Sequence, residues 1–191
     1  MAGVRAGRPR ASSRDVLAEA ACELFLEQGF EATSIADIAR RAGVSRSSFF
    51  NYATSKAGLL WAPFDERSAV LADLLDAPGH PLDAVLRSAV LTFAEGLRPD
   101  ALALAIANAD AMGMAADLER ESAVRMARIA STIATGARRG GRDGLSADIA
   151  GAAYAGAVMS ALRHWALAGP GTRALRDVLA DALDALPGAV S

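Results

Sequence analysis

Apolar residues recur at helical spacing along nearly the whole chain from about residue 14. In the first such stretch, residues 14–28, they follow the i, i+3, i+4, i+7 rule, while Glu19, Glu23 and Glu27 fall on another face. Gly29 then ends the pattern, as a glycine just past a helix does by adopting positive φ. No stretch alternates apolar and polar residues between turn signals as strands do. The pattern therefore predicts an all-α protein.

Two short helices are expected after the first one, and each begins with a serine. Ser34 stands where an N-cap is expected, and Asp37 three residues later resembles the acid of a capping box. Gly43 ends this helix, and after Val44 the next helix begins with Ser45 as its N-cap. A longer helix followed by two short ones around a tight glycine turn matches the helix-turn-helix pattern.

The rest of the chain keeps helical periodicity, interrupted by glycine and proline. The expected helical segments are 55–77, 82–97, 100–111, 113–137, 146–168 and 172–186. Pro63 lies inside the first of them, where we expect it to kink or divide the helix. The sequence thus predicts an N-terminal three-helix unit followed by a larger C-terminal helical bundle.

Composition narrows the class of protein further. The chain contains 46 alanines and 5% aromatic residues, which favours helix over strand. A single cysteine, Cys22, cannot form an internal disulfide, so a reducing cytoplasm is the simplest location. The longest charge-free apolar run, residues 149–162, has 14 residues, fewer than the ~18 that a membrane-spanning helix needs. The N-terminus has no apolar h-region, so neither a signal peptide nor a membrane is expected.

Charge is distributed unevenly, although the formal net charge is only −2. Residues 1–14 carry +4, residues 15–60 carry −2 and residues 61–191 carry −4. We expect residues 1–13 to form a flexible basic arm that attracts phosphates. Within it, residues 7–10 (Gly-Arg-Pro-Arg) resemble the core of an AT-hook, so insertion into a narrow minor groove is an alternative to nonspecific attraction.

Residues 16–60 contain a series of short runs in a characteristic order and spacing. The runs are Leu24-Phe25, Gly29-Phe30, Ala32-Thr33-Ser34-Ile35, Asp37-Ile38-Ala39, Ala42-Gly43-Val44-Ser45, Ser55-Lys56 and Leu59-Leu60. Together they resemble the DNA-binding domain of the TetR (tetracycline-repressor) family of bacterial transcriptional regulators. The resemblance implies that residues 14–60 are a DNA-binding domain whose helix-turn-helix lies at about 34–53. Beyond about residue 65 it is one of length and helical content only.

The third helix offers the side chains that base and phosphate recognition requires. Arg46, Ser47 and Ser48 occupy its first turn, and Asn51 and Tyr52 follow one turn later. Arg46 can contact guanine O6 and N7 with two hydrogen bonds, and Asn51 can read adenine or bind phosphate. The two serines are short donors suited to a phosphate or a base edge. We therefore expect this helix to enter the major groove.

Further contacts to the DNA backbone are expected around the same helices. Free amides at the helix starts near Ser34 and Ser45 favour phosphates. The resemblance implies phosphate contact for Ser48 and for Lys56, the only lysine, and contact to the DNA backbone for Tyr52. Our candidates for DNA binding are therefore Ser34, Ser45, Arg46, Ser47, Ser48, Asn51, Tyr52 and Lys56.

Two positions depart from the family pattern. Phe50 stands where a tyrosine is usual and lacks its hydroxyl, and Ala53 replaces an aromatic residue that packs between the third and fourth helices. These departures leave an alternative open. The chain could be a small-molecule-binding helical protein whose DNA function is weakened or absent.

Residues 61–191 contain no recognisable catalytic or metal-binding constellation. His80 and His164 lack an HxxxH or HExxH partner, and the glycine-rich residues 140–144 lack the lysine of a P-loop and follow no strand. We expect no enzyme activity, no metal and no cofactor.

In the resembled family this C-terminal region is a regulatory domain that binds a small molecule and dimerises through its last two long helices. Ala152, Gly156 and Ser160 form a row of small residues that a partner helix could approach closely, with internal packing as the alternative. The soft, aromatic or polar candidates for a ligand pocket are Trp61, Phe64, Phe93, Asn108, Met112, Met126, Tyr154 and Trp165, each of which could instead be core.

The sequence as a whole predicts a cytoplasmic homodimer that regulates transcription. We expect a repressor that binds a palindromic operator in double-stranded DNA. Its small-molecule effector, for which an apolar or aromatic compound is the best guess, would release or modulate it. Such an effect is allosteric only if the effector distinguishes two states of the protein.

Overall fold

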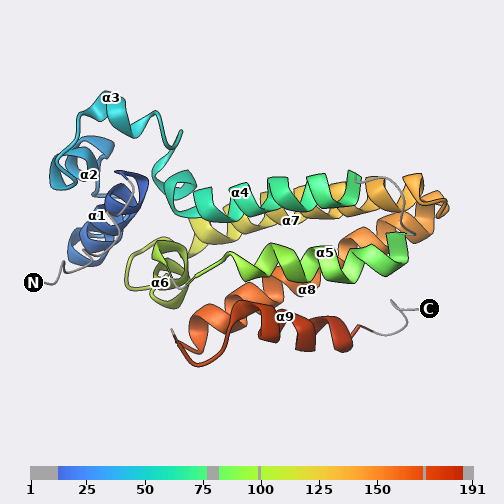
Figure 1. Cartoon of the computed structure of the whole chain (residues 1–191). Coiled ribbons are helices and arrows are strands. Elements are labelled where there is room, and N and C mark those ends of the chain that lie inside the picture. Colours follow the sequence, from blue (N-terminus) through green and yellow to red (C-terminus); the bar gives the residue numbers. More distant parts are fainter. Residues whose placement is uncertain (1–12, 77–81, 99, 170, 187–191) are drawn as a thin grey trace, which may run out of the picture.

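The computed structural model describes residues 13–76, 82–98, 100–169 and 171–186, and within these ranges every regular element is a helix (Figure 1). The helices are α1 (Ser13–Gln28), α2 (Ile35–Arg41), α3 (Arg46–Phe49), α4 (Lys56–Asp76), α5 (Leu82–Glu95), α6 (Ala101–Ala107), α7 (Ala115–Arg139), α8 (Gly144–Leu167) and α9 (Leu175–Asp184). The predicted all-α fold is confirmed. The AT-hook-like residues 7–10 lie outside the described residues.

Helices α1, α2 and α3 gather at one end of an elongated helical body (Figure 1). Leu17 and Phe25 of α1, Ile38 of α2 and Phe49 of α3 are fully buried and belong to the core that holds these helices together. Leu17 and Phe25 lie eight residues apart on one face of α1, as the apolar pattern of this helix predicts.

The capping box predicted at the start of α2 is present. The Ser34 hydroxyl accepts a hydrogen bond from the Asp37 amide at 3.1 Å, and the Asp37 carboxylate accepts one from the Ser34 amide, also at 3.1 Å. Hydrogen bonds from the Ser34 side chain and from Arg40 hold the pKa of Asp37 down to about 2. The box fixes where the chain leaves the turn after α1 and enters α2.

We expect Ser34→Ala to lower the free energy of unfolding by ~1 kcal/mol, because it removes the N-cap acceptor of the Asp37 amide. An Asp titrates at ~3.9 in the unfolded chain. The contribution of the Asp37 charge is therefore complete above about pH 4 and is lost as the pH falls toward the folded pKa of about 2. Urea unfolding at pH 7 and near pH 2.5 measures both effects. Ser88→Ala, which removes only a bond to the Val85 carbonyl, is the control. An equal loss for Ser34→Ala at both pH values would contradict the assignment.

The body of the molecule is organised around α7 and α8, which lie side by side (Figure 1). The two helices lie very close at Gly151, where a Cβ would lie 2.3 Å from the Ala130 carbonyl oxygen. Helix α8 also packs against α9 and α6, and α4 packs against α5 and α7. This arrangement brings the end of α8, the start of α7 and the α6–α7 turn to the same region as the start of α4.

Two expectations about helix boundaries are wrong. Of the kink or division expected at Pro63, the division does not occur, because α4 continues from Lys56 to Asp76. The buried residues Leu60 and Phe64 on either side of the proline hold both halves of the helix in the core. Helix α6 ends at Ala107 rather than near 111, because the Asn108 side chain donates to the Leu104 carbonyl and a turn follows.

Helix α8 is the one helix in the described part of the chain that is long and apolar enough to cross a membrane by length and composition. The expectation that no membrane-spanning helix is present considers only charge-free runs. Helix α8 is longer than the charge-free run 149–162 because it includes Asp148 and Arg163. Half of its apolar window is buried inside the protein, as in a core helix. On its other side Leu145 is 72% and Ile149 59% exposed, and no atom lies within 4 Å of a Cβ added at Gly156.

Candidate functional site

Helix α3 and the residues that flank it carry six of the eight residues that we predicted to contact DNA. Ser45 caps the helix by accepting a hydrogen bond from the Ser48 amide at 3.1 Å, and its hydroxyl also lies 2.8 Å from that of Ser47. Arg46 and Ser47 are exposed, and Phe49 on the opposite side is fully buried. The buried phenylalanine anchors the helix, and its polar first turn faces outward.

The residues beyond α3 continue in a tighter turn. Helix α3 ends at Phe49, so Asn51 and Tyr52 do not lie in a second α-helical turn as predicted. Their amides donate to the carbonyls of Ser48 at 3.2 Å and Phe49 at 2.9 Å, and both side chains are exposed. The i→i−3 spacing of these bonds is that of a 3₁₀ turn, which keeps both residues next to the helix.

The two departures from the family pattern have different environments. Phe50 is 49% exposed and contacts the ring of Phe49 edge-on, with ring centroids 5.5 Å apart. Ala53 is half-buried and packs against the hydrophobic core. Phe50 therefore adds an apolar group to the exposed side of α3. Ala53 leaves the connection between α3 and α4 packed against the core.

Lys56, the first residue of α4, is half-buried and bonded within the protein. Its Nζ donates hydrogen bonds to the carbonyl oxygens of Phe30 at 2.6 Å and Thr33 at 2.8 Å. The ammonium also lies over the Phe30 ring, 4.2 Å from its centroid. Two of its three N–H groups are thus used before any DNA is present.

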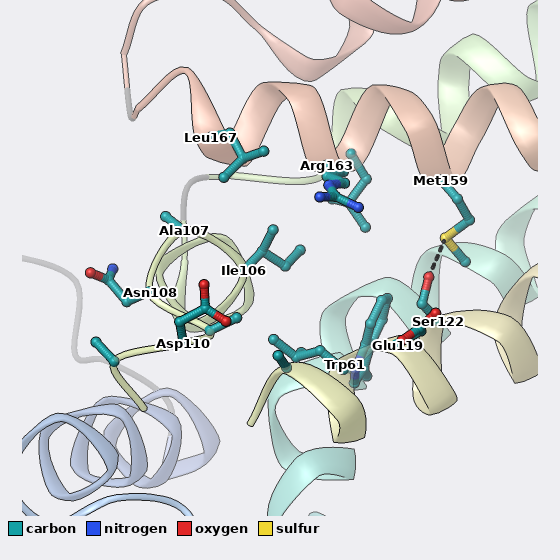
Figure 2. A pocket seen from close by; sticks show the side chains of 15 residues that line it. Trp61, Ile106, Ala107, Asn108, Asp110, Glu119, Ser122, Met159, Arg163 and Leu167 are labelled. Carbon is teal, nitrogen blue, oxygen red and sulfur yellow. Dashed lines mark hydrogen bonds between the residues drawn. The ribbon is translucent and has the colours of Figure 1, made fainter. Parts of the chain in front are cut away.

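A cavity of about 660 Å³ opens where the α6–α7 turn meets α4, α7 and α8 (Figure 2). Figure 2 shows Asn108 and Asp110 on one side, Arg163 and Leu167 of α8 on another, and Trp61, Glu119 and Ser122 opposite them. The wall comprises Trp61, Ile106, Ala107, Asn108, Ala109, Asp110, Ala111, Ala115, Leu118, Glu119, Ser122, Met159, Leu162, Arg163 and Leu167. It is mostly apolar, with a few polar groups, as ligand sites are.

Two of the eight residues predicted for a pocket, Trp61 and Asn108, line this cavity. The others lie elsewhere: Phe64, Phe93 and Met112 are fully buried, Tyr154 and Trp165 are 4% exposed, and Met126 is 42% exposed. Apart from Asp110, a polar residue in an otherwise apolar segment, the sequence did not single out the remaining wall residues, because most are alanine, leucine and surface charges on separate helices. No local pattern identifies them.

Trp61 joins the cavity to an ion-pair cluster behind it. Its indole Nε1 is buried and has no hydrogen-bond partner among the described residues. The Arg125 guanidinium lies over its ring at 4.6 Å. Arg125 in turn donates to both oxygens of Asp65, at 2.8 and 2.7 Å, and to the Glu121 carboxylate. Because Asp65 lies on α4 and Glu121 on α7, the cluster links these two helices.

Residues 17–62, which include most of α1 and the start of α4, match the family model for bacterial regulatory proteins of the tetR family. This segment belongs to the DNA-binding domain of the TetR family. Its curated relatives are "Putative mycofactocin biosynthesis transcriptional regulator MftR" of Mycobacterium tuberculosis, 37% identical over 91 residues, and "HTH-type transcriptional repressor ComR" of Escherichia coli, 37% identical over 59 residues. These matches cover 47% and 31% of this chain, and 46% and 28% of the relatives. The chain thus spans less than half the length of the curated relatives that it matches, and both are regulators by name rather than enzymes.

Solved structures of transcriptional repressors resemble most of the fold. A FadR repressor of Thermus thermophilus in complex with lauroyl-CoA is 29% identical, with 90% of this chain and 91% of that chain covered and a TM-score of 0.52. NalD of Pseudomonas aeruginosa, 20% identical, covers 90% of this chain and 93% of its own, with a TM-score of 0.56. The second likeness concerns the fold alone.

Proposed function

We propose that this TetR-family protein is a transcriptional regulator that binds operator DNA through α3. The observation that carries the proposal is the exposed first turn of α3, where Arg46 and Ser47 project from a capped helix at one end of the molecule. Ser48, Asn51 and Tyr52 extend this surface, and the amides near Ser34 and Ser45 supply phosphate donors. Residues 14–60 act as the DNA-binding domain and residues 61–191 as the regulatory domain.

The regulator acts as a homodimer through α8 and α9. In support, the exposed side of α8 bears Leu145, Ile149 and the small residues Ala152, Gly156 and Ser160. Such a row allows two helices to approach closely, and the apolar side chains favour burial. A two-fold dimer would present two α3 helices to a palindromic operator, with half-sites about 34–36 Å apart.

The cavity is the effector site. Ten of its fifteen wall residues are apolar, which fits a compound with an apolar or aromatic body. The lauroyl-CoA of the Thermus thermophilus relative makes a long-chain acyl compound the first candidate. The carboxylates of Asp110 and Glu119, against the single guanidinium of Arg163, disfavour the phosphates of coenzyme A at this mouth.

The protein acts in the cytoplasm as a repressor and catalyses no reaction, since its curated relatives are regulators by name. A protein that kept only ligand binding is the alternative, since Phe50 lacks the hydroxyl of the usual tyrosine. Selection of genomic DNA fragments on the purified protein decides between them: an enriched palindrome supports the proposal, and recovery of no preferred sequence favours the alternative.

We expect Arg46→Ala to weaken binding to the selected operator by ~1–3 kcal/mol and to relax the base preference at one position of each half-site. The reason is the loss of a side chain able to bond guanine with two hydrogen bonds. Fluorescence anisotropy with single-base operator variants measures both effects. Arg120→Ala, an exposed arginine of α7 paired with Asp117, is the control and should leave binding unchanged. An unaltered affinity for Arg46→Ala would remove this residue from the interface.

A further inference from the structure

A second cleft, of about 740 Å³, lies between α4 and α7, and none of its described wall residues belongs to the effector cavity. Helix α4 contributes residues that recur at i, i+4, i+7 and i+8, namely Gly58, Ala62, Asp65 and Glu66. Helix α7 contributes residues that recur at i, i+3, i+4 and i+7, namely Glu121, Val124, Arg125 and Arg128. Residues 51–55, which connect α3 to α4, and Arg14 of α1 complete the wall. These spacings place one face of each long helix in the cleft.

The charges along the cleft are largely paired within the protein. Asp65 and Glu121 both accept hydrogen bonds from Arg125, whose side chain is 7% exposed. Glu66 accepts one from Arg14. Arg128, by contrast, is exposed and forms no ion pair or hydrogen bond with any described residue. The wall thus carries as many carboxylates as guanidiniums, and among its described residues the guanidinium of Arg128 is the one left unpaired.

Neutral hydrogen-bonding groups line the same cleft. The side chains of Asn51, Tyr52 and Thr54 are exposed and form no hydrogen bond with any described residue. An amide and two hydroxyls can both donate and accept. The apolar part of the wall includes Ala62 and Val124, of which the valine is 46% exposed. A ligand that matches these groups carries several hydroxyls on a compact carbon frame.

We propose that this cleft is a second small-molecule site and that it takes a singly charged hydroxy acid. The Arg128 guanidinium holds the carboxylate, because its planar fork matches the two carboxylate oxygens. The Asn51 amide and the Thr54 hydroxyl bond the hydroxyl groups of the same molecule. A polyanion fits poorly, because three carboxylates lie along the same wall. The site is separate from the effector cavity and adds a second ligand to the proposed function.

Isothermal titration calorimetry of the full chain without DNA tests the site with gluconate, a linear hydroxy acid, and quinate, a cyclic one. We expect at least one of the two to bind, with one site per chain. Sorbitol, which has a hydroxymethyl group in place of the carboxylate of gluconate, should not bind, because it cannot pair with Arg128. Binding of neither acid, or equally strong binding of sorbitol, would overturn the proposal.

Two arginine variants distinguish this cleft from the effector cavity. Arg128→Gln should weaken binding of the acid by about tenfold or more, because it removes a charge-assisted pair of hydrogen bonds. Thermal unfolding should stay unchanged, since this side chain has no partner in the described part of the chain. Arg163→Gln, which removes the arginine of the cavity wall, is the matched control and should bind the acid as the wild type does. Weaker binding in Arg163→Gln but not in Arg128→Gln would place the acid in the cavity and overturn the proposal.

A third variant tests the space itself. Ala62→Leu adds a larger side chain to the α4 wall and should abolish binding of the acid by filling the cleft. Unchanged binding in a folded Ala62→Leu protein would contradict the assignment of the cleft. If this variant does not fold, the two arginine variants still decide the question.

Discussion

Asp65→Leu should destabilise the protein more than Arg125→Met, although each variant removes one partner of the same ion pair. The difference follows from which charge is left behind. The Arg125 side chain is 7% exposed, whereas that of Asp65 is 38% and that of Glu121 30% exposed. Without Arg125, both carboxylates turn toward water. Without Asp65, a buried guanidinium keeps only Glu121 and the Trp61 ring.

We expect a loss of ~3 kcal/mol for Asp65→Leu, the low end of the range for a buried charge deprived of its partner. Arg125→Met, which preserves the packing of the stem, should cost ~1 kcal/mol, because exposed carboxylates rehydrate. The double variant should lose less than the sum of the two, since it leaves neither charge unpaired. Urea unfolding gives all three values. Equal losses for the two single variants would contradict this account.

Gly151→Ala is expected to destabilise the protein by ~1–3 kcal/mol, the usual cost of overpacking a close contact. The added Cβ would lie 2.3 Å from the Ala130 carbonyl oxygen and 3.2 Å from the Ala134 Cβ, so α7 and α8 must separate. This loss opposes the gain of up to ~1 kcal/mol that replacing a helical glycine by alanine usually brings.

A matched substitution on the same helix separates these two effects. Gly144→Ala, at the start of α8, places its Cβ where no atom lies within 4 Å. It should leave stability unchanged or raise it slightly. Thermal unfolding of both variants at one protein concentration makes the comparison, because dimerisation would make the transition depend on concentration. A Gly151→Ala protein as stable as the wild type would show that the α7–α8 contact is loosely packed.

The sequence correctly predicts those structural features that depend on residues close together in the chain. The Ser34 and Ser45 caps lie within three residues of the amides that they accept from, so α2 and α3 start where predicted. Local rules are not sufficient at Pro63. Its position predicts a kink or a division of the helix, and the division does not occur because buried neighbours on both sides keep α4 continuous.

The cavity and the ion-pair cluster could not be predicted in this way. Trp61, Asp110 and Arg163 are far apart in the chain and come together through the packing of α4, the α6–α7 turn and α8. Likewise, the pairing of Asp65 with Arg125 spans 60 positions. Several residues chosen for their soft or aromatic side chains, such as Phe64 and Phe93, form core instead. Side-chain character alone does not separate core from cavity wall.

The bond between the Phe30 amide and the Met112 carbonyl joins two peptide groups and no side chains. At position 30 only proline would remove the donor, and at position 112 every amino acid supplies the acceptor. Regulatory domains that change their effector must replace many of the residues around a cavity. A main-chain connection survives such replacements, so the cavity side of this protein can diverge in evolution while its attachment to the helix-turn-helix persists.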